Sequence, residues 1–259
     1  MNKASHADKM KSLPTHLTNF MKISSVILPW LTSITLCLLI LGLTLIVHSP
    51  NDYQQGITVK IMYIHVPFAW LSTFCYMIIS AAALGSLIWK HCLADVALKC
   101  GAPIGAIFTA LALITGALWG RPTWGTWWVW DARLTSVFIL FFIYLAIIML
   151  AYSFDNQAKA ARATAILTLV GFINIPIIKF SVNWWNTLHQ SASLLRPGGP
   201  TIDRAMLCPL ITMIFCFSLM FISLYLMAMR NEINSYHIKI LQIRKARHAQ
   251  YQESSSCST

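Results

Sequence analysis

Five tryptophans stand within twelve residues of this chain, and an aspartate follows them directly. The segment contains Trp119, Trp124, Trp127, Trp128 and Trp130, and then Asp131. Each indole ring offers a broad apolar face and one N–H donor. Such a density of rings predicts either an interfacial anchor, because tryptophan is enriched at membrane surfaces, or a platform for a large flat ligand.

Charged side chains flank these rings. Arg121 and Arg133 carry forked donors that suit carboxylates, and Asp131 is within reach of either arginine in sequence. If residues 127–131 form a helix, Trp127 and Asp131 share one face of it. The segment therefore combines an apolar bed with groups that bind anions.

Two histidines outside the tryptophan segment are candidate metal ligands. His65 precedes the second apolar stretch of the chain, and His189 follows Trp184 and Trp185. Residues 182–195 are typical of an interfacial amphipathic helix, which would put His189 on the same side as Trp185. Either histidine alone is more often a surface or capping residue. Together, beside an aromatic bed, they suit the axial ligation of iron in a flat macrocycle.

Composition places the chain among membrane proteins. It is 57% hydrophobic and 10% charged, with a mean hydropathy of +0.64. The seven cysteines include no CxxC or CxxCH pattern, so zinc binding and covalent c-type haem attachment to this chain have no support. The formal charge of +11 is explained better by membrane topology than by nucleic acid binding.

Six segments are long and apolar enough, or nearly so, to cross a bilayer as helices. They are Val26–Val47, Val66–Trp89, Ala102–Leu118, Leu134–Tyr152, Ala163–Ile178 and Met206–Met229. The fifth is the shortest and contains Asn174 and Pro176, and Lys179 can snorkel from its end. We therefore predict an all-α integral membrane protein with six transmembrane helices.

Basic residues predict the orientation of these helices. Most lysines and arginines outside the spans lie in the two tails and in the second and fourth loops, so both termini are expected in the cytoplasm. We predict cytoplasmic tails at 1–25 and 230–259, the second partly disordered, around a membrane domain at 26–229. The loops 48–65, 119–134 and 179–205 then share the external face. A third histidine there, His48, lacks aromatic neighbours and is a weaker candidate ligand.

Several function classes lose support. The spans hold no ionisable residue well inside them, which argues against an ion-coupled transporter. No P-loop motif and no arrangement of nucleophile, base and acid is apparent, so we predict that the chain is not an enzyme and does not itself bind ATP.

The tryptophan segment and its continuation through Arg133, Leu134 and Thr135 closely resemble the WWD signature of a haem-handling family. Within that family the match is to the CcmC group, the haem exporter C proteins of cytochrome c maturation. The stretch from Ser181 to Gln190 also resembles that group, as do the six spans and the length. The resemblance covers roughly Val26 to Met229.

The resemblance implies a function and its partners. CcmC-like proteins bind haem b non-covalently and transiently at the periplasmic face of the bacterial inner membrane, with the WWD segment against the macrocycle. By motif position, His65 and His189 would be the axial ligands. The family passes haem to the chaperone CcmE, and the small subunit CcmD and the ABC-type pair CcmA and CcmB belong to the same pathway. We expect Arg121 and Arg133 to contact the haem propionates or to order Asp131.

Two other functions stay open at this point. The chain could be a permease subunit of an ABC-type haem exporter, which predicts transport that depends on the ATPase. It could also be a membrane scaffold that the tryptophans only anchor.

Overall fold

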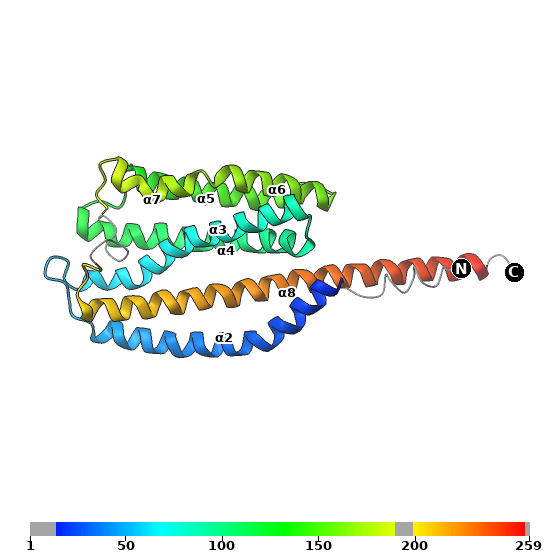
Figure 1. Ribbon diagram of the computed structural model, residues 1–259, viewed down its shortest axis with the longest axis horizontal. Coiled ribbons are helices and arrows are strands. Elements are labelled where there is room, and N and C mark those ends of the chain that lie inside the picture. Colours follow the sequence, from blue (N-terminus) through cyan, green and yellow to red (C-terminus); the bar gives the residue numbers. More distant parts are fainter. Residues whose placement is uncertain (1–13, 190–198, 257–259) are drawn as a thin grey trace.

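The computed structural model describes residues 14–189 and 199–256, and its regular elements there are all helices (Figure 1). They are α2 (Thr15–His48), the short 3-10 helix η1 (Ile57–Ile61), α3 (Met62–Trp89), α4 (Cys92–Trp124), α5 (Ala132–Ala151), α6 (Gln157–Gly171), α7 (Asn174–Trp184) and α8 (Arg204–Ser256). Six segments are long and apolar enough to cross a membrane, with α6 and α7 together forming the fifth. The prediction of an all-α protein with six spans is confirmed.

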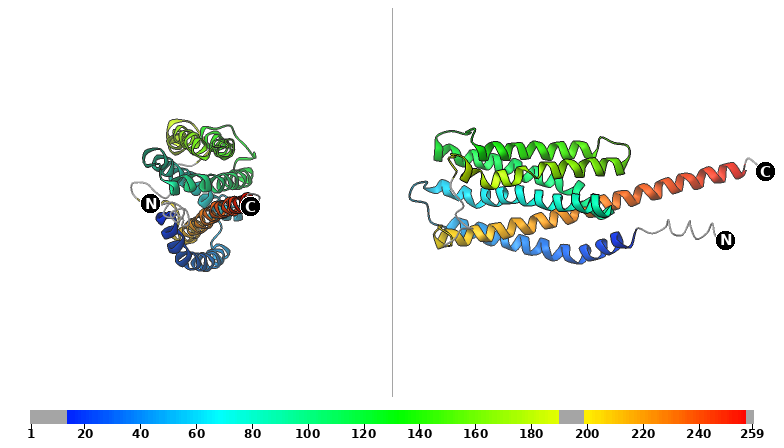
Figure 2. Two further views of the ribbon diagram at one scale, coloured as in Figure 1. Left: turned by 90° about the vertical axis from the view of Figure 1, so that its right-hand side faces the viewer. Right: turned by 45° about the horizontal axis from the view of Figure 1, so that its top comes forward.

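The helices form three layers. α2 packs against α8, α3 packs against α4, and α5 packs against both α6 and α7. The central α3–α4 layer lies between the other two, which the end view in Figure 2 shows. α3 contacts α6 and α8, and α4 contacts α5 and α8, so both helices of the central layer join the outer layers.

Loops after the first, third and fifth spans meet at one end of the bundle, which we call the tryptophan end (Figure 1). The first turn of α2 and the last turn of α8 lie at the opposite end. This arrangement follows from the even number of crossings, and it brings together segments that are far apart in the sequence.

The fifth span is broken between α6 and α7, and a proline lies in the first turn of α7. Pro176 has no N–H to donate to the preceding turn, so a straight helix would leave a carbonyl unpaired. The break places the side-chain amide of Asn174 against the carbonyl of Ser136, at 2.8 Å in the buried interface with α5. Neighbouring helices thus satisfy the polar groups of the break, as the membrane interior requires.

Close packing around two tyrosines fixes the interior layers. The fully buried hydroxyl of Tyr144 donates to the carbonyl of Ser72, and that of Tyr76 donates to the carbonyl of Thr168. A Cβ on Gly105 would lie 2.3 Å from the ring of Tyr144, so only glycine fits at that point of α4. Small residues let membrane helices approach in this way.

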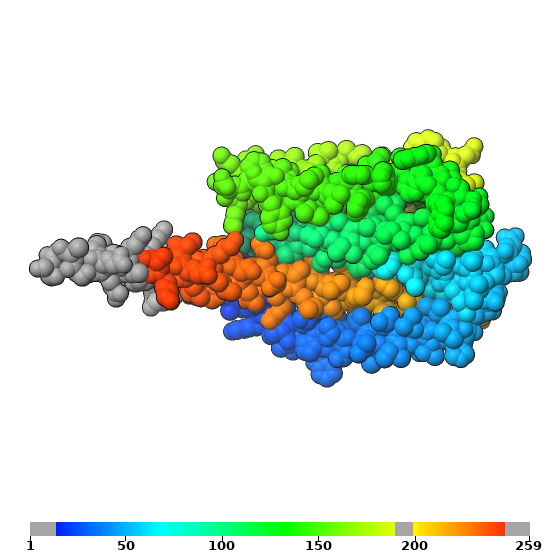
Figure 3. All heavy atoms as spheres, turned by 180° about the vertical axis from the view of Figure 1, so that it is seen from behind, coloured from blue at the N-terminus to red at the C-terminus, as the bar shows by residue number. Residues whose placement is uncertain are grey.

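The last helix is longer than the predicted span. α8 extends beyond the bundle (Figure 3) and ends at Ser256. Partial disorder of the tail at 230–259 stays a prediction. Residues 230–256 contain no glycine or proline and are rich in helix formers, so nothing in the sequence stops the helix. Residues 257–259 lie outside the described part of the chain.

Candidate haem-binding site

A cavity of about 480 Å³ opens at the tryptophan end between α3, α4, α5 and α7. Its size is typical of pockets that hold drug-sized ligands and cofactors. His65 from α3 and His189 from the loop after α7 both line it, so the structure brings the two candidate ligands into one space.

His65 is held by a threonine of the neighbouring helix. Its Nδ1 lies 3.1 Å from the hydroxyl oxygen of Thr115. That hydroxyl already donates its proton to the carbonyl of Leu111, at 2.7 Å. It therefore accepts from His65, which places the imidazole proton on Nδ1 and leaves the lone pair on Nε2 available to a metal.

His189 is held by a carboxylate. Its Nδ1 lies 3.2 Å from Oδ2 of Asp131, and the carboxylate also accepts from the hydroxyl of Thr187. An ionised carboxylate can only accept, so Nδ1 carries the proton and Nε2 is again the free nitrogen. Carboxylate–histidine pairs of this kind orient metal ligands and raise their basicity.

Asp131 has a second task at the start of α5. Its Oδ1 accepts from the backbone N–H of Leu134 at 2.7 Å, which makes it the N-cap of that helix. The side chain is therefore fixed by the helix that it caps while its other oxygen holds His189. A rigid element thus sets the position of a loop histidine.

The surroundings of this pair affect the pKa values of both groups. Burial lowers the pKa of His189, and the hydrogen bond and charge of Asp131 only partly oppose this effect. Burial by itself would raise the pKa of Asp131, but the hydrogen bonds from Thr187, Leu134 and His189 outweigh it and lower the value. At neutral pH, His189 is thus neutral and Asp131 is ionised, which are the forms that ligation needs.

Indole rings pack against both histidines. Trp119 meets His65 edge to face with ring centroids 5.6 Å apart, and Trp124 meets His189 in the same way at 4.9 Å. Trp128 lines the cavity, and its buried Nε1 has no hydrogen-bond partner among the described residues. A buried donor without a partner is costly, so it favours a ligand that carries an acceptor.

Two cationic side chains line the cavity. Nε of Arg133 lies 3.4 Å from the hydroxyl of Ser181, and Lys179 extends from α7. Arg121 does not line it: its guanidinium donates to the carbonyl of Gly125 and lies over the ring of Trp127. The structure therefore gathers Arg133, and not Arg121, with the histidines.

Comparison with known proteins gives one family. The family model described as Heme exporter protein C, or CcmC, matches residues 12–244. The chain is 57% identical over 229 residues to Heme exporter protein C of Bradyrhizobium diazoefficiens, which covers 88% of this chain and 87% of the relative. It is 46% identical over 207 residues to Heme exporter protein C of Escherichia coli K12, covering 80% and 83% of the two chains.

The chain belongs to the heme exporter protein C family. It is therefore a multi-pass membrane protein with a role in haem handling for cytochrome c maturation. Members of this family are haem-handling components and not enzymes. A protein named as a putative ccmC-like mitochondrial protein of Marchantia polymorpha is also similar, at 44% identity over 191 residues, with 74% of this chain and 81% of the relative covered.

The predicted site residues divide into those that line the cavity and those that do not. His65, His189, Trp124, Trp128 and Arg133 line the cavity. The remaining candidates do not line it. They are Trp119 and Asp131, which contact the histidines, and Arg121, Trp127, Trp130, Trp184 and Trp185, which lie further out.

Two local structures differ from the prediction. Residues 125–131 are not helical, because α4 ends at Trp124 and α5 begins only after its cap. The amphipathic helix predicted over 182–195 is confirmed only at 182–184 and is wrong from Trp185 to His189, since α7 ends at Trp184 and Trp185 is extended. Thr187 bonds to Asp131 and to the backbone N–H of His189, and these contacts replace helical ones. Residues 190–198 lie outside the described part of the chain.

Sequence reasoning missed Thr115 and underestimated Lys179. Thr115 precedes Trp119 by four residues, so both lie on the face of α4 that meets His65. That spacing could have identified it. Lys179 was interpreted only as a snorkelling residue, and its position at the cavity depends on how α7 packs against α5.

Proposed function

We propose that this chain binds haem b at the periplasmic face of the bacterial inner membrane and delivers it to the chaperone CcmE. The observation that carries the proposal is the convergence of His65 and His189 on one cavity, each with Nδ1 hydrogen-bonded. Histidine is a standard ligand of haem iron, and the Nε2 atoms that these contacts leave free would hold the iron.

The walls of the cavity fit the rest of the haem. Apolar residues of four helices line most of it, as the macrocycle requires. Arg133 and Lys179 supply positive charge for two propionates, and the unpartnered N–H of Trp128 supplies a further donor. This chain's residues would bind, orient and screen the haem, and none of them would act on it as acid or base.

The orientation of the bundle supports a periplasmic site. The sequence assigns fewer basic residues to the tryptophan end than to the opposite end, which carries α8's extension with Arg230, Lys239 and Arg244. By the distribution of positive charge, the opposite end is cytoplasmic. The exposed rings of Trp127 and Trp130 then face the periplasm, where CcmE would dock. CcmD, CcmA and CcmB would be further partners in the same pathway.

Haem transfer in a purified system tests this function. The protein with CcmD, loaded with haem in proteoliposomes, is mixed with apo-CcmE in the absence of CcmA, CcmB and ATP. We expect haem to appear on CcmE, and to appear much more slowly when both His65 and His189 are alanine. Transfer that occurs only with CcmA, CcmB and ATP would contradict the proposal and favour a permease subunit.

A further inference from the structure

The cavity reaches far deeper into the membrane domain than its histidines. One stripe of α3 lines it at intervals of four residues, from His65 through Ala69 and Thr73 to Met77. Met77 follows His65 by about 18 Å along the helix axis, which is close to the middle of α3. On α4 the lining ends at Ala112, three residues from the Thr115 that bonds to His65, so α4 borders the cavity only at the level of this histidine. The cavity is thus a long groove from the tryptophan end to the centre of the bundle.

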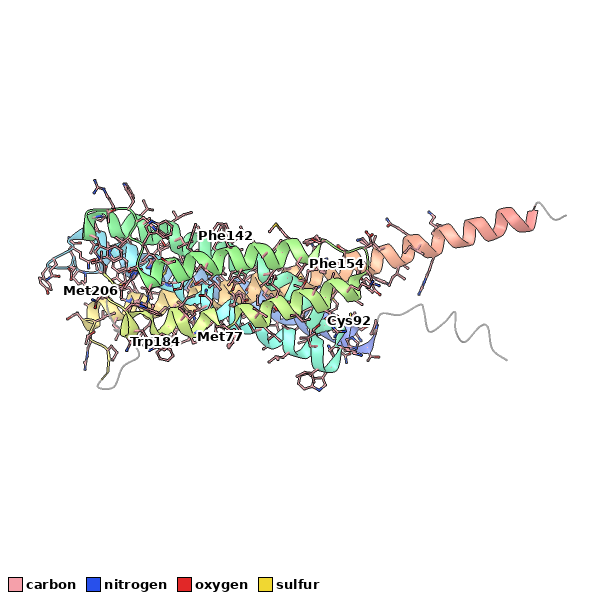
Figure 4. The ribbon with its side chains drawn as sticks, turned by 90° about the horizontal axis from the view of Figure 1, so that it is seen from above. Met77, Cys92, Phe142, Phe154, Trp184 and Met206 are labelled. Atoms are coloured by element: carbon pink, nitrogen blue, oxygen red, sulfur yellow. The ribbon has the colours of Figure 1, made fainter. Side chains whose placement is uncertain are left out.

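One side of this groove faces outward. α3 packs against α4, α6 and α8, whereas α7 packs against α5, and few residues of α3 contact α7. On the α3 rim, Trp70 is 40% exposed and Met77 is 37% exposed. Met77 lies at the edge of the bundle, on the same side as Trp184 at the end of α7 (Figure 4). The gap between α3 and α7 therefore opens onto the surface that the bilayer covers.

The opening carries positive charge, which suits a ligand with negatively charged groups. Lys179 is exposed on the α7 rim, five residues before the fifth span ends at Trp184, and makes no ion pair with any described residue. A lysine so close to a helix end can extend its ammonium group to the membrane interface, where it can meet an anionic group. Arg133 is the second cation, further inside. An apolar groove with a cation at its rim and another within it matches a flat, apolar dicarboxylate.

We propose that the groove is a lateral portal through which haem passes between the bilayer and the two histidines. Lys179 would take a propionate at the rim, and the apolar stripe of α3 would guide the macrocycle toward His65. This inference rests on the proposed haem-binding function, but it adds a route: the ligand exchanges with the membrane through the gap between α3 and α7, without crossing the aqueous face.

An obstruction in the groove tests the portal. Thr73 lines the groove, and its hydroxyl bonds to the carbonyl of Trp70 in its own helix. Thr73→Trp fills the groove below the histidines. The matched control is Thr32→Trp on α2, where an exposed hydroxyl also bonds within its own helix and the residue does not line this groove. Each protein is reconstituted in lipid vesicles, and haem is supplied from a second population of haem-loaded vesicles.

The readout is the rate at which the bis-histidine absorption spectrum develops. We expect Thr73→Trp to slow loading several-fold and Thr32→Trp to load at the wild-type rate. Loading of Thr73→Trp at the wild-type rate would overturn the portal. A wild-type protein that never develops the spectrum would instead contradict the proposed haem site, so the two failures are distinguishable.

A second variant keeps the test independent of the folding of Thr73→Trp. Lys179 is exposed, so its replacement leaves the packing of α7 intact. Loss of a charge-assisted hydrogen bond predicts loading about tenfold slower in Lys179→Ala, with recovery in Lys179→Arg. A wild-type rate in Lys179→Ala would overturn the proposal. So would slow loading in Lys179→Ala beside normal loading in a folded Thr73→Trp, because Lys179 would then bind a lipid phosphate and not haem in transit.

Discussion

His65 donates from Nδ1 to the hydroxyl of Thr115, and this single bond determines which ring nitrogen carries the proton. The threonine can accept because its own proton is directed to Leu111 within α4. A helix that contributes no metal ligand thus selects the tautomer of a ligand on its neighbour.

Thr115→Val removes this acceptor at nearly constant volume. Loss of an outer hydrogen-bond partner typically weakens metal binding by about 10–100-fold, and we expect haem affinity to fall within that range. Titration of haem into the purified variant measures it. Thr115→Ser keeps the hydroxyl and serves as the control, and equal affinity in the valine and serine variants would contradict the role of the bond.

Asp131 combines two roles that substitution can separate. Asparagine still caps a helix, so Asp131→Asn should keep the stability of α5 while it removes the carboxylate that holds His189. We expect weaker haem binding with a nearly unchanged unfolding temperature. Asp131→Ala should lose the cap as well, at a cost of about 1 kcal/mol of stability. Thermal unfolding and haem titration of both variants check this, and identical behaviour of the two would count against it.

Gly116 gives His65 the space that it occupies. A Cβ on this residue would lie 3.0 Å from Cε1 of the imidazole, so Gly116→Ala should displace the ring and weaken haem ligation. Gly85 on α3 is a matched control, because its added Cβ would meet Ala94 at an ordinary 3.4 Å. Absorption spectra of the two variants distinguish them, and an unchanged spectrum in Gly116→Ala would show that the histidine does not need this space.

The sequence predicted the fold well because hydropathy alone identifies membrane helices. It placed helix ends less well, since α4 and α8 continue past their apolar stretches into polar residues that also favour helix. Pro176 correctly marked the weak point of the fifth span. Boundaries depend on capping and packing, which hydropathy does not report.

Residue type alone pointed to His65, His189 and the tryptophans, and the structure places both histidines, Trp124 and Trp128 around one cavity. The positions of site residues could not be predicted where they depend on a tertiary contact. Thr187 bonds to Asp131, and no local pattern shows that this bond replaces the helix expected around His189. Arg121 and Arg133 look equivalent in sequence, yet the end of α4 turns the first toward Gly125 and Trp127.

The most direct test of the central claim is the absorption spectrum of the purified protein and of three single variants, His65→Ala, His189→Ala and His48→Ala. His48 is the control, because it is exposed at the end of α2, where Nδ1 bonds to the carbonyl of Thr44, and it does not line the cavity. We predict a low-spin bis-histidine spectrum in the wild type and in His48→Ala, and its loss in both other variants. An unaltered spectrum in both His65→Ala and His189→Ala would contradict the assignment of these residues as the axial ligands.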